Sequence, residues 1–400
     1  MVKIVLIDKE CGKGSGGVIR FSLKCVEYLK FSLLFCVLFF ILSGCQDVTQ
    51  SQVEKGKVEE ATPTELPQPH NEINAKKITP IPTEGFDKIV GWQDEQSIIF
   101  LYEEDSKAII ASYNLYSGQQ KELYSTEDPV TDVILSPNGK MILAITSPYT
   151  YRATVHVISI QEPKILYSQD IDSFQLNVEW NRWDESSILI TAFDQNWGFK
   201  VFLLNWNGRR LEPIDAPQPF LKWQSKSSLL AQDWDRNGQS LEAPIMSLDI
   251  RKMTEWKQVT PAAIHFDVFG KILMTITESS TDSDRAIYQF YDGDMKKLSS
   301  FTAPQISQYS DWLVPYYDLN DQTNELLTFV PYKSGVIDEY TEGFQLMKYS
   351  FDQGKQTIVV DHLDNEPLKC SPDGTKCLYG FQLEKLIDIK TNKITNLVQQ

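Results

Sequence analysis

The segment from Asp233 to Glu242 has the residue types and spacing of a loop that binds a hard metal ion. Asp233, Asp235 and Asn237 alternate and are followed by a glycine, as in the Asp-x-Asp-x-Asn-Gly opening of a calcium loop. Ca²⁺ takes about six to eight oxygen ligands, and this spacing converges three of them around the turn. Glu242 is the candidate fourth ligand, two residues earlier than in an EF-hand loop. A polar turn without metal is the default interpretation, so no cofactor is required and calcium is only a candidate.

A second pair of reactive groups, Cys370 and Cys377, flanks the turn Ser371-Pro-Asp-Gly-Thr-Lys376. Antiparallel strands on either side of such a turn would place the two thiols opposite each other. They could form a disulfide, which an oxidising exterior permits. Two free, half-buried thiols are the equal alternative.

Classical catalytic motifs are missing from the chain. It has four histidines, and none of them belongs to a metal-binding or nucleophile motif. His265 and Asp267 stand two apart in a predicted strand, but a catalytic arrangement would need a third partner that the sequence does not identify. The net charge of −16 argues against nucleic acid as a partner, because phosphate contacts need clustered Lys and Arg.

The start of the chain has the features of an export signal. A twelve-residue apolar run, Phe31–Leu42, follows a basic segment and is too short to span a bilayer as a helix, which needs about 20 residues. It fits the apolar core of a signal peptide. Residues 1–17 do not fit this pattern, and a later codon such as that of Val18 is a candidate start.

The residues after the apolar run, Leu42-Ser-Gly-Cys45, resemble the lipobox of bacterial lipoproteins. The resemblance implies cleavage between Gly44 and Cys45 and acylation of the Cys45 thiol, typically with palmitate. Residues 1–44 would then be a signal peptide, and the lipid would hold the protein on the outer face of the cell membrane. Residues 45–83, rich in Pro, Glu, Thr and Lys, are predicted to be a disordered tether.

From residue 84 onward the chain repeats with a period in the forties. Successive strand ends fall 44, 44, 43, 44, 49 and 54 residues apart, at the positions Trp92, Ser136, Trp180, Trp223, Asp267, Tyr316 and Cys370. Short strands rich in β-branched and aromatic residues, separated by Gly, Asn, Asp and Pro, are typical of a β-propeller. We therefore expect an all-β fold over residues 84–400, with four-stranded blades of which seven are counted and six are possible. The recurring tryptophans are interpreted as packing residues between blades.

The turns Ser136-Pro-Asn-Gly-Lys140 and Ser371-Pro-Asp-Gly-Thr375 resemble those of the WD40-like repeats in TolB-type propellers. With the lipobox and the tether, this layout is similar to that of the YqgU-like lipoproteins of Bacillus relatives. That family is six-bladed, and the resemblance implies architecture rather than an activity.

In a propeller, the loops between the second and third strands of the blades gather on one face. These loops are predicted to carry an excess of acids and to form an acidic face around the mouth of the central channel. Its main candidates are Glu103, Glu104, Asp282, Asp284, Asp338 and Glu339.

The sequence thus favours a membrane-anchored binding or scaffolding module. Its partner would be an envelope protein, a peptide or a polymer. The alternative is an extracellular hydrolase or lyase that uses carboxylates at the channel mouth. An enzyme of that kind should bring two carboxylates within about 5–10 Å of each other in a concave pocket.

Overall fold

The structure is a computed structural model, and it describes residues 77–398 except 236–239, 253–254, 309–310 and 321. The predicted cleavage site at Gly44 and Cys45 lies outside the described residues. No helix that is long and apolar enough to cross a membrane occurs in the part that is described.

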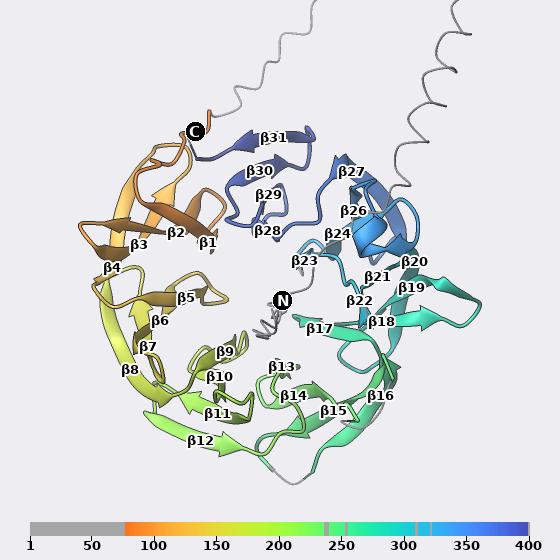
Figure 1. Cartoon of the computed structure of the whole chain (residues 1–400), viewed down its shortest axis with the longest axis horizontal. Coiled ribbons are helices and arrows are strands. Elements are labelled where there is room, and N and C mark those ends of the chain that lie inside the picture. Colours follow the sequence, from red (N-terminus) through yellow and green to blue (C-terminus); the bar gives the residue numbers. More distant parts are fainter. Residues whose placement is uncertain (1–76, 236–239, 253–254, 309–310, 321, 399–400) are drawn as a thin grey trace, which may run out of the picture. The chain divides into compact units, whose positions relative to one another are not determined.

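Seven four-stranded antiparallel sheets follow one another along the chain and form the blades of a ring (Figure 1). Blade 1 is β1 (Phe86–Trp92), β2 (Ser97–Glu104), β3 (Lys107–Asn114) and β4 (Gln120–Thr126), and blade 2 is β5 (Val130–Leu135), β6 (Met141–Tyr149), β7 (Arg152–Ser159) and β8 (Lys164–Asp172). Blade 3 is β9 (Gln175–Trp180), β10 (Ser187–Phe193), β11 (Phe199–Asn205) and β12 (Arg210–Ile214), and blade 4 is β13 (Lys222–Trp223), β14 (Ser228–Gln232), β15 (Ala243–Asp249) and β16 (Lys257–Ala263).

The remaining three blades follow the same order. Blade 5 is β17 (His265–Phe269), β18 (Ile272–Ser279), β19 (Asp282–Tyr291) and β20 (Lys297–Pro304), and blade 6 is β23 (Tyr317–Asn320), β24 (Glu325–Pro331), β26 (Phe344–Ser350) and β27 (Lys355–Leu363). Blade 7 is β28 (Leu368–Cys370), β29 (Lys376–Tyr379), β30 (Lys385–Asp388) and β31 (Lys393–Asn396). In every blade the first strand is innermost (Figure 1). The all-β propeller and the count of seven units are confirmed.

A small accessory sheet interrupts this pattern between blades 5 and 6. It pairs β21 (Ile306–Gln308) with β22 (Asp311–Trp312) and, in parallel, with β25 (Gly335–Val336), which continues into the short 3₁₀ helix η1 (Ile337–Glu339). The strands β21 and β22 add residues between blades 5 and 6, which explains why the strand ends at Asp267 and Tyr316 are 49 residues apart and not 44. Tyr316 itself stands just before the inner strand β23.

The hydrophobic core consists of the contacts between blades. Seven clusters of buried side chains are present among the described residues, and each joins two neighbouring blades, including blade 7 with blade 1. Second strands are consequently buried on both faces: every residue of β10 is buried. The repeat tryptophans belong to these contacts, because Trp92, Trp180 and Trp223 are 7%, 7% and 2% exposed. This supports their interpretation as packing residues.

The two motif turns have the same geometry and pack against a neighbouring blade. In each, the glycine amide donates to the carbonyl of the preceding serine, Gly139 to Ser136 at 2.9 Å and Gly374 to Ser371 at 2.8 Å. Gly139 has a φ of +69°, and a Cβ there would lie 2.4 Å from the Gln93 carbonyl oxygen of blade 1. Glycine is thus required both by the backbone conformation and by the close approach of the neighbouring blade.

The ring closes through residues that the sequence assigned to the tether. Ile81 is fully buried between blades 1 and 7, and its amide donates to the Leu397 carbonyl at 2.7 Å. The Thr79 amide donates to the Leu115 carbonyl at 2.7 Å, and the Tyr113 hydroxyl donates to the Pro80 carbonyl at 2.7 Å. Residues 77–83 therefore belong to the folded domain, and the predicted boundary at residue 84 is corrected. The apolar residues Ile78 and Ile81 are too few to show periodicity in a Pro- and Thr-rich sequence.

The first testable prediction concerns this closing contact. Ile81→Ala removes a fully buried side chain from the cluster between blades 1 and 7, so we expect a loss of about 2–4 kcal/mol in the free energy of unfolding. Denaturant unfolding measures the loss, and Ile165→Ala, at a position 49% exposed, is the control with a change below about 0.5 kcal/mol. Equal stability of the two variants would contradict a role of Ile81 in ring closure.

Candidate functional site

One end of the ring carries two kinds of loop: the turns between the second and third strands, and the connections from each blade to the next. This follows from the strand order, because the second and fourth strands run in the same direction and end on the same side. Hydrogen bonds join the two kinds of loop, as where the Ser173 amide donates to the Tyr151 carbonyl at 3.1 Å. We call this end the connection face.

Exposed aromatic side chains gather on the connection face of blades 2, 3 and 4. Six large aromatic residues are exposed among the described residues, and all but Phe381 lie here. We call these five the aromatic strip: Tyr149, Tyr151, Phe174, Trp197 and Phe220, with exposures of 70%, 60%, 48%, 41% and 52%. Exposed aromatic residues that cluster, rather than stand singly, mark interaction surfaces.

The buried Phe193 connects the members of the strip that come from blade 2 with those next to blade 4. The rings of Tyr151 and Phe174 lie 6.2 Å apart, and the Phe174 amide donates to the Phe193 carbonyl at 2.7 Å. The buried ring of Phe193 is then flanked by Trp197 at 6.1 Å and by Phe220 at 5.8 Å. Blade 2, blade 3 and the connection to blade 4 thus contribute successive rings to one surface.

Trp197 is displayed from a strained turn. Its φ of +63° is unusual for a bulky residue. Asp194 holds the turn, because its Oδ1 accepts from the amides of Asn196 at 2.8 Å and Gly198 at 2.9 Å. Strain of this kind persists where the surroundings enforce it and is concentrated at functional sites.

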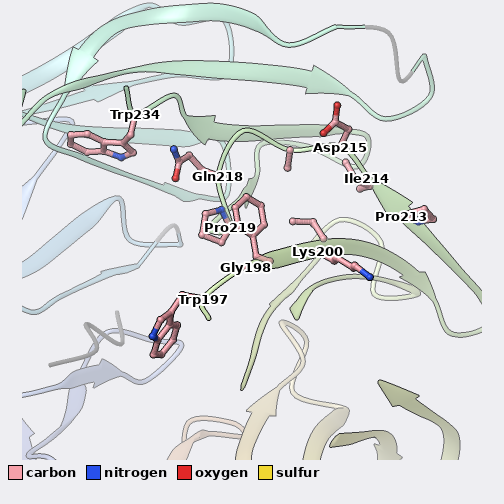
Figure 2. Close-up of a pocket in the computed structure, with 12 residues that line it drawn as sticks. Trp197, Gly198, Lys200, Pro213, Ile214, Asp215, Gln218, Pro219 and Trp234 are labelled. Atoms are coloured by element: carbon pink, nitrogen blue, oxygen red, sulfur yellow. The ribbon is translucent and has the colours of Figure 1, made fainter. Parts of the chain in front are cut away.

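A cavity of about 790 Å³ lies at the blade 4 end of the strip. Trp197 and Trp234 line it together with Gln218 and Pro219 of the connection between blades 3 and 4 and with Asp215. Figure 2 shows that the Gln218 side chain extends toward Trp234, whereas Trp197 comes from a separate hairpin. Aromatic walls with a few polar groups are typical of small-ligand sites, and the volume is in their usual range of about 300–1,000 Å³.

Sequence reasoning missed the strip. Its residues stand in turns and connections, which lack the regular spacing that identified the packing tryptophans. The signal that could have found them is their shared location in loops of one kind, for example Tyr149 and Tyr151 in the turn at 147–153 and Trp197 in the turn at 194–199.

The predicted acidic residues lie on the connection face but do not converge on one point. Glu103 and Glu104 end β2 in blade 1, Asp282 and Asp284 begin β19 in blade 5, and Asp338 and Glu339 are in η1 of blade 6; all six are exposed. They are thus spread over the rim of three blades, none of which contributes a residue to the aromatic strip.

The structure describes the predicted calcium loop only in part, because Asn237 lies outside the described residues. The Oε1 atom of Glu242 accepts from the Glu278 amide of blade 5 at 3.0 Å. Within the described residues, no group of three His, Cys, Asp or Glu side chains could hold a metal ion. Calcium stays a prediction.

Cys370 and Cys377 are cross-strand partners in β28 and β29. The structure joins them as a disulfide, with the sulfur atoms 1.95 Å apart. This is one of the two alternatives that the sequence left open.

The innermost strands carry a network of charged and polar side chains. The Lys222 ammonium of blade 4 lies 3.2 Å from a Glu179 carboxylate oxygen of blade 3 and 3.3 Å from one of Asp267 in blade 5. The Tyr317 hydroxyl of blade 6 donates to the other Asp267 oxygen at 2.9 Å, and it lies 2.6 Å from His265 Nε2. Tyr317 is thus the third partner of His265 and Asp267 that the sequence could not identify.

At Asp267, Lys222 and Glu179, burial and the oppositely charged neighbours shift the pKa in opposite directions. Burial opposes the charge on Asp267, but Lys222, His265 and the hydrogen bonds from Val268 and Tyr317 outweigh it and keep the pKa below its ordinary value. Burial likewise opposes the charge on Lys222, but Asp267 and Glu179 raise its pKa. Burial is the larger effect at Glu179, whose pKa is raised despite Lys222. Burial and Asp267 raise the pKa of Tyr317 well above 10.0.

The second prediction follows from the Asp267 pKa. Asp267→Asn removes one of the two carboxylate partners of Lys222 and leaves only Glu179. We therefore expect the free energy of unfolding to fall by about 3 kcal/mol at pH 7. A lowered pKa means that the Asp267 charge stabilises the fold above pH 3.8 and ceases to do so as the pH falls through its folded pKa. The difference in free energy of unfolding between wild type and variant should therefore become smaller below about pH 4.

Urea unfolding at several pH values measures this difference. Asp294→Asn, in an exposed turn, is the control. A difference that stays constant down to pH 3 would contradict the stabilising role of the Asp267 charge.

Comparison with known proteins agrees with this architecture. The protein named Uncharacterized lipoprotein YqgU, from Bacillus subtilis (strain 168), is 25% identical over 369 residues, which cover 92% of this chain and 96% of that protein. The crystal structure of the uncharacterized protein lmo1340 from Listeria monocytogenes EGD-e superposes with a TM-score of 0.76 at 24% identity, covering 81% of this chain and 98% of that one. A more distant fold neighbour is an oligogalacturonate lyase in complex with manganese, with a TM-score of 0.52, 11% identity, and 74% and 85% of the two chains covered.

The family described as the YqgU-like 6-bladed beta propeller domain matches residues 114–380. The matched residues run from the end of β3 in blade 1 to just past β29 in blade 7, so that blades 2 to 6 lie wholly inside them. The described structure has one four-stranded blade more than the family description names. With two thirds of its length matched, this chain belongs to the YqgU-like propeller family.

Proposed function

We propose that this protein is an anchored binding module that holds a neutral glycan strand on the aromatic strip of its propeller. The single observation that carries the proposal is the continuous strip of exposed rings across blades 2 to 4, which leads into a cavity with two tryptophans. A sugar ring has an apolar face of C–H groups and a rim of hydroxyls. It therefore suits a surface of flat aromatic side chains with polar groups between them.

The polar groups near the strip favour a ligand without net charge. Arg152 forms an ion pair with Asp172 at 3.2 Å, and the charged side chains that line the cavity are one base, Lys200, and one acid, Asp215. Ser173 is 8% exposed and adjoins Phe174 in the sequence, and its hydroxyl has no hydrogen-bond partner. Hydroxyl-rich ligands satisfy groups of this kind, whereas a basic peptide would be favoured by an acidic surface.

The same geometry gives less support to the alternative of a hydrolase or lyase. Glycan hydrolysis needs two carboxylates about 5–10 Å apart on either side of the scissile bond. Asp215 is the one carboxylate among the described residues that line the cavity. Glu179 and Asp267 do approach each other through Lys222, but that contact occupies both of them.

The relative named as a lipoprotein supports a membrane anchor for this chain. We propose that Cys45 carries the lipid and that the propeller works outside the cytoplasmic membrane. The third prediction is that Cys45→Ala prevents acylation, so that the protein no longer partitions with the membrane fraction. Labelling with radioactive palmitate and fractionation of cells measure both effects; a variant that stays labelled and membrane-bound would exclude Cys45 as the anchor.

The fourth prediction tests the strip. Full-length protein in detergent micelles is titrated with chitohexaose, a neutral oligomer of N-acetylglucosamine, by calorimetry and tryptophan fluorescence. Trp197→Ala should weaken binding about tenfold, because a buried aromatic contact at the centre of an interface contributes more than about 1.4 kcal/mol. Tyr151→Ala should weaken it by a similar factor.

Phe381→Ala is the matched control, because Phe381 is 71% exposed in the turn between β29 and β30 of blade 7 and lies outside the strip. It should leave the affinity unchanged. Absence of saturable binding by wild type, or equal weakening by Phe381→Ala, would contradict the glycan proposal. Release of new reducing ends from chitohexaose would favour the hydrolase instead.

A further inference from the structure

A second and smaller cavity lies on the connection face at blades 5 and 6, where the exposed side chains are acidic and not aromatic. It has a volume of about 250 Å³ and is enclosed by the β18–β19 turn of blade 5, the accessory sheet and the loop that follows β24. The side chains that define its chemistry are Asp284, Gln305, Ser307, Trp312 and Ser334.

Three serine hydroxyls line this cavity, and two of them, those of Ser307 and Ser334, already donate their proton to a carbonyl and face a ligand as acceptors. Ser334 Oγ donates its proton to the Asp284 carbonyl at 2.5 Å, and Ser307 Oγ donates to the Gly335 carbonyl at 3.4 Å. A hydroxyl has one proton and two lone pairs, so Ser307 Oγ keeps two lone pairs for a ligand. Ser334 Oγ keeps one, because it also accepts from the Gln305 amide at 3.4 Å. An ionised Asp284 carboxylate is likewise an acceptor without a donor. The cavity therefore suits a ligand that carries several hydrogen-bond donors.

Gln305 provides an independent sign that a partner is missing. It is 8% exposed and lines the cavity, and its Oε1 has no hydrogen-bond partner. A buried polar atom without a partner is unfavourable by about 1–3 kcal/mol, so native proteins rarely leave one without a reason. The terminal amide turns readily about its last bond, which lets its oxygen accept from a ligand in the cavity.

The surrounding charges select a cation. Asp282 and Asp284 both stand at the start of β19, and Asp338 and Glu339 follow the cavity residue Val336 after one intervening residue. Of the neighbouring bases, Lys333 forms an ion pair with Glu342, and the Arg285 guanidinium donates to Thr302, a residue that does not line the cavity. Trp312 adds an aromatic ring, which attracts cations through its π-electrons.

We propose that this cavity binds a primary ammonium group, the donor-rich cation carried by a lysine side chain or by a free alkylamine. Its three N–H groups match the acceptors of Asp284, Gln305 and the two serines, and its charge matches the acidic rim. This site is independent of the glycan proposal, because it lies on blades 5 and 6 and shares no residue with the aromatic strip.

The fifth prediction is tested by calorimetry on the full-length protein in detergent micelles at low salt. The probes are the peptide acetyl-Gly-Lys-Gly-amide, its uncharged counterpart with norleucine in place of Lys, and cadaverine. We expect saturable binding of the lysine peptide and at least about tenfold weaker binding of the norleucine peptide, because a charge-assisted hydrogen bond is lost. Binding of cadaverine as well as the peptide would identify the ammonium group itself as the ligand, whereas binding of the peptide alone would identify a lysine within a chain.

Two variants locate the site. Asp284→Asn should weaken binding of the lysine peptide at least about tenfold. Asp294→Asn is the same change in an exposed turn at the other end of blade 5 and should leave the affinity unchanged. Gln305→Leu should weaken binding without lowering thermal stability, since it removes a buried atom that has no partner. The proposal is overturned if wild type does not distinguish lysine from norleucine, or if Asp294→Asn weakens binding as much as Asp284→Asn does.

Discussion

The structure depends on the burial of both faces of every blade against its two neighbours. Each of the seven apolar clusters joins two blades, so an open ring would leave one face of blade 1 and one of blade 7 in water. All four strands of blade 7 come from consecutive chain, and among the described residues the one β-bridge outside the named strands is the parallel bridge of Ile81 with Val398. The seam is closed by packing, by the hydrogen bonds around Ile81, and by the contact of the Trp92 indole with the Lys369 carbonyl at 2.9 Å. Residues outside the repeat are therefore part of the fold's stability.

Because stability resides between the blades, the loops of the connection face are free to differ from one blade to the next. Blades 2 to 4 display aromatic rings there, and blades 1, 5 and 6 display carboxylates. The strained backbone at Trp197 is tolerated because β10 and β11 on either side of its turn are fully paired and β10 is buried throughout.

The fold was largely predictable from the sequence, and the site was not. A 44-residue period, short β-branched strands and Pro-Asn-Gly or Pro-Asp-Gly turns are local signals that the chain repeats, and the seven units that they predict are the seven blades. The signals failed where structure depends on distant chain: Ile81 is ordered by Leu397, and Tyr317 lies 52 residues from His265. The acidic residues of the rim could be predicted from the composition of the loops. The hydrogen-bond acceptors around Asp284 could not, because they depend on the carbonyl groups to which Ser307 and Ser334 donate in the folded structure.

The inner-strand network connects the two halves of the connection face. Glu179, Lys222, Asp267 and Tyr317 link blades 3, 4, 5 and 6 in sequence, and these are the blades that carry the end of the strip and the ammonium cavity. Buried charged residues stabilise a fold less than apolar residues of equal size would. They are more specific, because an ion pair forms only with a group of opposite charge at the right distance and orientation. A chain of such contacts fixes the rotation of each blade relative to the next. Fixed rotation is what a binding face assembled from separate blades requires, because a small turn of one blade would separate Trp197 from Trp234 across their shared cavity.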